Sequence, residues 1–273
     1  MHWFVVDETN KNSVSGQFFI IGGLVFREDQ IEKIHSAIEI IRLQRGYRRG
    51  DKLKFQSSAR PEHVTIENAL AAKQEVISAL RTIGVRMITY VLLHDVGAGK
   101  SEQARMEMGL NTLTWAYYRL LATENAWGCM MIDRDDKQHG HLVTLFQEGV
   151  GSASKTSLRD RIKFYGMTSD NASHLSSAVD IALGGFRFCV NAAGKDSVTD
   201  AGQVTVQNIF QPLSELLWGV EVEGKRHIGG FGYLERPQVV RAHTYREKYD
   251  ILKRKLESYS GSSATPVDGA DEP

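Results

Sequence analysis

Residues 2–10, HWFVVDETN, form a run of strand-forming side chains that ends in two adjacent carboxylates, Asp7 and Glu8. Residues 17–26, QFFIIGGLVF, are again apolar and rich in β-branched and aromatic side chains, and the segment between the two runs has turn composition. Two such runs predict a β-hairpin at the start of a sheet. Asp7 then has two interpretations: a turn residue that ends its strand, or a carboxylate held there to bind a metal ion.

Composition restricts the class of protein. A chain of 273 residues can bury a substantial core, and 42% hydrophobic with 24% charged residues is ordinary for a soluble globular protein. The 33 basic and 33 acidic residues cancel, so net charge does not select a polyanionic partner. Cys129 and Cys189 lie in apolar runs and are predicted to be reduced core residues. Without a signal-peptide pattern or a run of roughly 20 apolar residues, we expect a cytoplasmic protein with no membrane contact.

Strands and helices alternate after the hairpin. Helical periodicity predicts helices over 28–45, 61–82, 101–122, 174–192, 206–219 and 243–259, the fifth kinked at Pro212. Buried strands are predicted over 85–93, 128–133 and 162–170. Two strands followed by this alternation indicate an α/β fold with a mixed sheet.

Three aspartates interrupt apolar segments: Asp7 and Asp133 each follow a strand, and Asp180 lies inside an apolar helix. An ionised carboxylate near a core is costly unless it is paired, hydrogen-bonded or metal-bound. Each has an ordinary explanation alone, such as a turn or a pairing with Arg187. Together they predict a site for Mg²⁺ or Mn²⁺, hard cations that prefer oxygen ligands, and therefore two-metal phosphoryl transfer. Because successive strand residues point to opposite faces, we expect Glu8 to join Asp7 only if the strand has already ended.

Four short motifs resemble a bacterial family known as domain of unknown function 3800. They are FVVDET with FFIIGGLVF (4–26), KLKF (52–55), MMID (130–133) and SHLSSAVDIALGGFRF (173–188). That family is similar to the ribonuclease H-like superfamily, whose nucleases hold divalent metals with acids on the first strand, the fourth strand and a late helix. The resemblance implies a ribonuclease H-like nuclease domain over residues 1–195, with C-terminal helices (196–260) packed on it. The small, polar tail (261–273) is predicted to be disordered.

The resemblance also implies roles for individual residues. The implied metal ligands and catalytic residues are Asp7, Asp133, Asp180 and Lys54, the last stabilising charge on the phosphoryl group. Lys52 stands where the family motif often has Glu, which leaves Asp51 or Glu8 as candidates for a fourth acid. Ser177, one turn before Asp180, is predicted to orient that carboxylate.

A basic segment precedes the KLKF motif. Residues 42–54, RLQRGYRRGDKLK, hold six basic side chains against one acid. The predicted contacts to a nucleic-acid backbone are Arg45, Arg48, Arg49 and Lys52, with Tyr47 stacking on a base. The alternative is an ordinary solvated helix end, where basic residues complement the helix dipole.

Two other functions fit part of the pattern. Residues 94–102, HDVGAGKSE, form a Gly-rich turn between a strand and a helix, as in a phosphate-binding loop, and Asp133 would then bind Mg²⁺ for nucleotide hydrolysis. His94, however, occupies the position of the Gly that lets such a loop curl around phosphates. The other alternative is a non-catalytic ribonuclease H-like scaffold that binds nucleic acid or protein.

Overall fold

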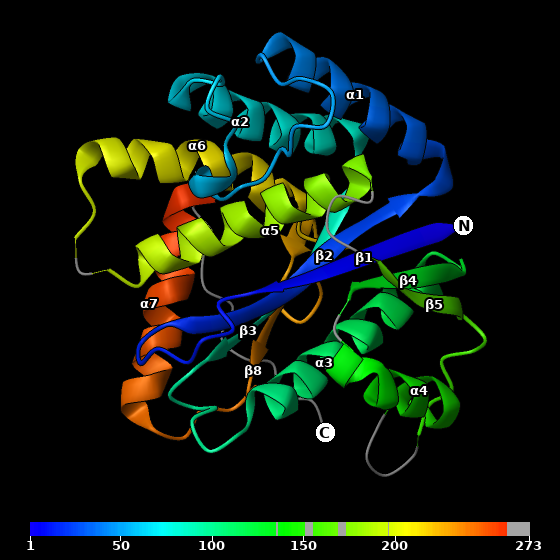
Figure 1. Cartoon of the computed structure of the whole chain (residues 1–273). Helices are drawn as coiled ribbons and strands as arrows, with labels where there is room; N and C mark the ends of the chain where they lie inside the picture. The colour runs from blue at the N-terminus through cyan, green and yellow to red at the C-terminus, as the bar shows by residue number, and fades with distance from the viewer. Residues whose placement is uncertain (135, 151–154, 169–172, 196, 261–273) are drawn as a thin grey trace.

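A six-stranded mixed sheet with helices on both faces forms the body of the protein (Figure 1). The computed structural model describes residues 1–134, 136–150, 155–168, 173–195 and 197–260, so the tail predicted to be disordered lies outside the described residues. The strands, in spatial order, are β5 (Ile162–Thr168), β4 (Gly128–Asp133), β1 (His2–Thr9), β2 (Phe18–Arg27), β3 (Arg86–Leu93) and β8 (Tyr233–Arg236). The α-helices are α1 (Ile31–Gln44), α2 (Ile66–Ile83), α3 (Glu102–Thr123), α4 (His139–Glu148), α5 (His174–Ala193), α6 (Asp200–Leu216) and α7 (His243–Ser260). Among the described helices, none is both long enough and apolar enough to cross a membrane.

The predicted N-terminal hairpin is confirmed, and it sets the centre of the sheet. β1 pairs antiparallel with β2, and Asp7 lies opposite Gly22. On its other side β1 pairs in parallel with β4, with Val6 beside Ile132. The next residues along the two strands are Asp7 and Asp133, so both aspartates stand at the same edge of the sheet.

The pleat of β1 divides the core into two layers and directs Asp7 into one of them. Phe4 and Val6 pack in the layer covered by α3 and α4. Val5 packs in the layer covered by α1, α2, α5 and α6. Since strand side chains alternate, Asp7 faces the same side as Val5. α5 packs across β1 and β2 on that side (Figure 1).

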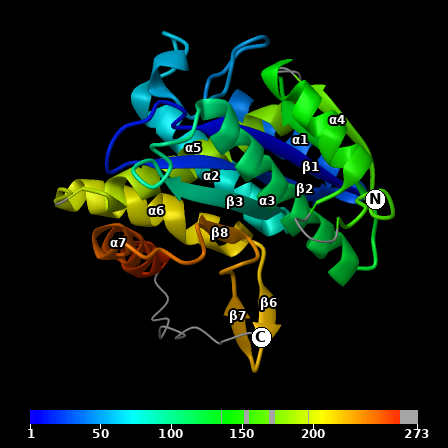
Figure 2. The same cartoon turned by 90° about the horizontal axis from the view of Figure 1, so that it is seen from below.

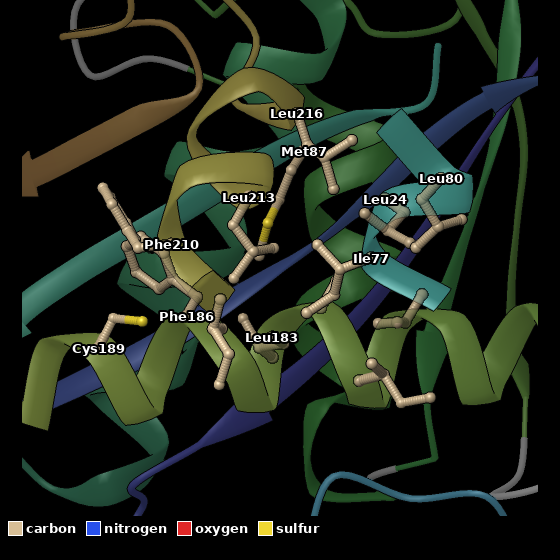
Figure 3. Packing of buried hydrophobic residues seen from close by; sticks show 14 of the residues in the cluster. Leu24, Ile77, Leu80, Met87, Leu183, Phe186, Cys189, Phe210, Leu213 and Leu216 are labelled. Carbon is tan, nitrogen blue, oxygen red and sulfur yellow. The ribbon is translucent and has the colours of Figure 1, made fainter. Parts of the chain in front are cut away.

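The layer beneath α5 is densely apolar. Figure 3 shows Phe186 of α5 close to Phe210 of α6, and their ring centroids are 6.4 Å apart. Cys189 lies in the same cluster, and both cysteines are free and buried as predicted. Apolar packing on this scale holds α5 rigidly, which matters because the helix carries Asp180.

Two elements before residue 195 differ from the predictions. The second helix begins at Ile66 instead of Pro61, because the Thr65 side chain caps it by accepting the Asn68 N–H at 3.1 Å. Between β4 and β5, where the sequence predicts no helix, the chain forms the short helix α4. Its few buried side chains, Leu142, Leu145 and Phe146, give too brief an apolar stripe to be recognised.

The segment after residue 195 contains more than the two predicted helices. α6 and α7 are present, but β6 (Val220–Val222) and β7 (Lys225–His227) form a projecting hairpin (Figure 2), and β8 joins the main sheet parallel to β3. The Tyr249 hydroxyl of α7 accepts the Leu93 N–H and donates to the Arg236 carbonyl, each at 2.7 Å. One of the two edge strands of the sheet, β8, thus comes from this segment. Strands of three or four residues are too short to show a period of two.

Candidate metal centre

Three carboxylates meet at the edge of the sheet where β1 and β4 end. Oxygen atoms of Asp7, Glu8 and Asp133 all lie within 4.8 Å of one another. Asp180 approaches from α5 and contributes to the electrostatic environment of Asp7. The acidic group is therefore assembled from two parallel strands and the helix that crosses them.

The electrostatics of Asp7 reflect this crowding. Burial raises the pKa of Asp7 to about 7, and the neighbouring charges of Glu8, Asp133 and Asp180 push the pKa in the same direction. A hydrogen bond from the Glu8 backbone N–H to Asp7 Oδ1, at 2.7 Å, opposes the shift. Partly buried carboxylates that repel one another in this way are stabilised by a bound cation.

Glu8 joins the group although β1 continues to Thr9, so the expectation that the strand must end first is wrong. Glu8 still pairs across the sheet with Ile21 of β2. On its other side the pairing with β4 stops at Ile132, and no described strand flanks Glu8 there. The longer Glu side chain can therefore turn around the open side of β1. An ion pair with Lys11 also holds the Glu8 carboxylate, which is largely buried.

The KLKF motif lies against α5 at Asp180. The Phe55 backbone N–H donates to Asp180 Oδ2 at 2.6 Å. Lys54 immediately precedes Phe55 and is half-buried. Ser177 is buried one turn before Asp180 on the same helix. The segments around the predicted residues Lys54, Ser177 and Asp180 are therefore neighbours.

Asp51 has other partners. It accepts the Arg48 backbone N–H at 2.5 Å and the ring of His63 at 3.0 Å, and these contacts lower its pKa. Both contacts organise the loop after α1. Of the two candidates for a fourth acid, Glu8 is the one that lies in the carboxylate group.

The basic segment before KLKF divides into exposed and structural residues. Arg48, Arg49 and Lys52 are exposed to solvent. Arg45 forms an ion pair with Glu75 of α2. These four side chains are the ones that the sequence assigns to contacts with a phosphate backbone. Three of them are open to solvent, whereas Arg45 is already engaged in its ion pair with Glu75.

Tyr47 and Arg42 hold the loop from inside. Tyr47 is only 4% exposed, so the prediction that its ring stacks on a base is wrong. Buried Arg42 donates to the carbonyls of Asp51 and Arg48, at 2.7 and 3.0 Å. Such bonds satisfy carbonyls of the turn and shape it.

Lys73 is a residue near the site that the sequence reasoning missed. It lies on α2, is 7% exposed, and places its Nζ 5.2 Å from the centroid of the Phe55 ring. Burial lowers the pKa of Lys73, and the charge of Asp180 opposes that shift. The sequence does contain a signal for this burial, because Lys73 lies at helical spacing on the same face of α2 as the apolar side chains Ile77 and Leu80.

The segment 94–101 does not have the geometry of a phosphate cradle. The N–H groups of Val96 and Gly97 both donate to the Leu93 carbonyl, and the Lys100 N–H donates to the Gly97 carbonyl. His94 is buried against the Asn10 carbonyl at 3.0 Å. Backbone donors that bond their own turn are not directed at a common anion. Two strands also separate β3 from β4, which carries Asp133.

Replacing Lys100 by Ala therefore distinguishes metal-dependent chemistry at the carboxylate group from nucleotide hydrolysis at residues 94–101. Lys100 is exposed, so Lys100→Ala is expected to leave both the thermal midpoint and the Mn²⁺ affinity unchanged. Calorimetric titration with ATP is expected to detect no binding to either protein. Micromolar ATP binding to the wild type that Lys100→Ala removes would instead favour nucleotide hydrolysis.

Comparisons of the chain with models of known families, with curated proteins and with solved structures found no match. The resemblance to domain of unknown function 3800 therefore stays an expectation drawn from its four motifs.

Proposed function

We propose that this protein is a ribonuclease H-like, divalent-metal-dependent hydrolase of nucleic-acid phosphodiester bonds. The observation that carries the proposal is the group of Asp7, Glu8 and Asp133, with Asp180 approaching from α5. Carboxylates at the ends of two neighbouring parallel strands, completed by an acid on a crossing helix, agree with the order that the resemblance implies.

The donor set fits a hard cation. Oxygen atoms of the three carboxylates all lie within 4.8 Å of one another, and carboxylate oxygens are the ligands that hard divalent cations prefer. We assign Mg²⁺ or Mn²⁺ as the cofactor, held by Asp7, Glu8 and Asp133, with Asp180 available for a second position.

The residues of the chain divide the work of hydrolysis. When bound, the metal ions polarise the phosphoryl oxygens and make bound water acidic. Asp7 releases its proton when a cation binds, so metal affinity rises with pH up to its pKa of about 7. Lys54, next to the contact between Phe55 and Asp180, stabilises negative charge on the phosphoryl group.

The exposed basic residues supply contacts to the nucleic acid. Arg48, Arg49 and Lys52 lead directly into Lys54, so a backbone bound by them continues toward the carboxylates. Phosphate contacts of this kind position a strand without reading its sequence. Binding should therefore weaken as salt concentration increases.

Asp180→Asn tests the proposal. Wild type is expected to bind Mn²⁺ in calorimetric titrations and to cleave labelled RNA or DNA. Asp180→Asn should weaken Mn²⁺ binding by at least about tenfold, because loss of even an outer partner of a metal ligand costs that much, and should abolish cleavage. Asp136→Asn is the control, since Asp136 is exposed and paired with Arg134.

Two results would count against the proposal. A folded wild type that binds no Mn²⁺ excludes the metal centre. Mn²⁺ binding without cleavage of either nucleic acid would favour the non-catalytic scaffold. In that case Asp180→Asn should change stability more than it changes nucleic-acid binding.

A further inference from the structure

The loop between α1 and α2 crosses α5 at an unusually short distance. A Cβ atom added to Gly184 would lie 2.4 Å from Cβ and 2.6 Å from Cγ of Phe55. Real Cβ atoms essentially never approach other heavy atoms within 3.0 Å. Phe55 can therefore contact α5 at this point only because residue 184 has no side chain.

The same approach brings the backbone of Phe55 to Asp180. Gly184 lies four residues after Asp180, and therefore on the same face of the helix. The Phe55 N–H donates to Asp180 Oδ2 at 2.6 Å, across 125 residues of sequence. The Phe55 ring is held 6.2 Å from the ring of Phe188, one further turn along α5, and 5.2 Å from Lys73 Nζ. The position of this N–H is thus set by contacts along α5 and with α2.

We propose that Phe55 and Gly184 are positioning residues for Asp180. The close contact at Gly184 holds the Phe55 N–H against one oxygen of the carboxylate, which fixes the orientation of Asp180 beside Asp7. This inference rests on the proposed function. Hydrogen bonds that orient a metal ligand commonly change metal affinity or activity about 10–100-fold.

Two adjacent glycines of α5 provide a matched pair of variants. Gly184→Ala forces the loop away from the helix. A Cβ on Gly185 would instead meet Leu213 Cδ1 at 3.1 Å and Ile209 Cγ2 at 3.2 Å, the ends of flexible side chains. Both changes add the same helix propensity, so a difference between them reports the contact with Phe55.

Gly184→Ala is expected to weaken Mn²⁺ binding about 10–100-fold, whereas Gly185→Ala should bind Mn²⁺ as the wild type does. In ¹⁵N-resolved NMR spectra, the Phe55 amide proton should move upfield and exchange faster with solvent in Gly184→Ala alone. This shift reports the hydrogen bond directly and does not depend on metal.

A rescue variant separates positioning from general damage to the fold. Phe55→Gly keeps the N–H and removes the Cβ that would collide with a side chain at residue 184. The double variant Phe55→Gly/Gly184→Ala is therefore expected to bind Mn²⁺ as tightly as Phe55→Gly does. A double variant that binds Mn²⁺ more weakly than Phe55→Gly would show that the effect of Gly184→Ala does not come from its collision with Phe55, and the proposal would be overturned.

The remaining outcomes distinguish this inference from the proposed function. Loss of the Phe55 hydrogen bond in Gly184→Ala with unchanged Mn²⁺ affinity overturns the positioning role and leaves the metal centre intact. Absence of Mn²⁺ binding in the wild type and in Gly185→Ala overturns the proposed function, and the positioning role with it.

Discussion

Asp7→Asn is expected to make the metal-free protein more stable at pH 8 while abolishing metal-dependent hydrolysis. The pKa of Asp7 in the folded protein is about 7, above the value of about 3.9 for an unfolded chain. Between these values the folded protein binds a proton that the unfolded chain does not, so stability decreases as pH rises through this window. At about 1.4 kcal/mol per pKa unit, the loss for wild type is at most about 4 kcal/mol. Asn does not titrate, so the Asp7→Asn variant avoids this loss of stability.

Urea denaturation in EDTA at pH 5 and pH 8 measures this effect. Wild type should lose stability between the two values, Asp7→Asn should change little, and the control Asp136→Asn should follow wild type. Mn²⁺ should stabilise only proteins that retain Asp7, because it binds the folded state. Hydrolysis should decrease by more than the about 10²–10³-fold typical of losing one charge-stabilising donor.

A loss of stability in Asp7→Asn would favour the other interpretation of Asp7, as a turn residue that ends its strand. If Asp7→Asn is less stable than wild type at pH 8 and Mn²⁺ stabilises neither protein, Asp7 is a structural residue at the end of its strand. The metal centre would then be excluded.

Gly23→Ala is expected to prevent folding. A Cβ atom at this position would lie 1.9 Å from the Val5 carbonyl oxygen and 2.9 Å from Val6 Cα. These are backbone atoms of β1, which is enclosed between β2 and β4 and cannot move aside without breaking a ladder. The cost should exceed the about 1–3 kcal/mol of ordinary overpacking, because no rotamer change relieves a clash with backbone.

Soluble yield, circular dichroism and urea denaturation measure the result. Gly99→Ala is the matched control, since a Cβ on Gly99 meets nothing within 4 Å. A Gly23→Ala protein that folds with the wild-type urea midpoint would show that β1 and β2 can move apart where Val6 pairs with residue 23.

The parts of the fold and site that the sequence predicts are those with local signals. The apolar run ending at Asp7 and the one ending at Asp133 identify two strands, and parallel strands bring their carboxyl ends to one edge. Whether Glu8 joins them depends on where the pairing with β4 stops, which no residue of β1 encodes. The edge strand β8 is missed because four residues carry no periodic pattern.

Contacts made by the backbone leave no trace in residue types. The hydrogen bond from Phe55 to Asp180 uses an N–H group that nearly every residue possesses. The sequence shows a glycine at position 184, but the reason that a side chain is excluded there is the close approach of the distant loop at Phe55. The prediction for Tyr47 is wrong for the converse reason: an aromatic side chain in a basic segment fits a nucleic-acid surface and a buried loop equally well.

The pairing of β1 with β4 has a consequence for the order of events during synthesis. His2 pairs with Gly128, so the first strand leaves the ribosome long before its parallel neighbour, while β2 and β3 are ready much earlier. The nascent chain can complete a three-stranded antiparallel intermediate, but β1 then remains an open edge until β4 arrives. Asp180 emerges later still. Under the proposed function, the group of Asp7, Glu8 and Asp133 therefore forms only after β4 has paired with β1, and Mn²⁺ binding would report this step of co-translational folding.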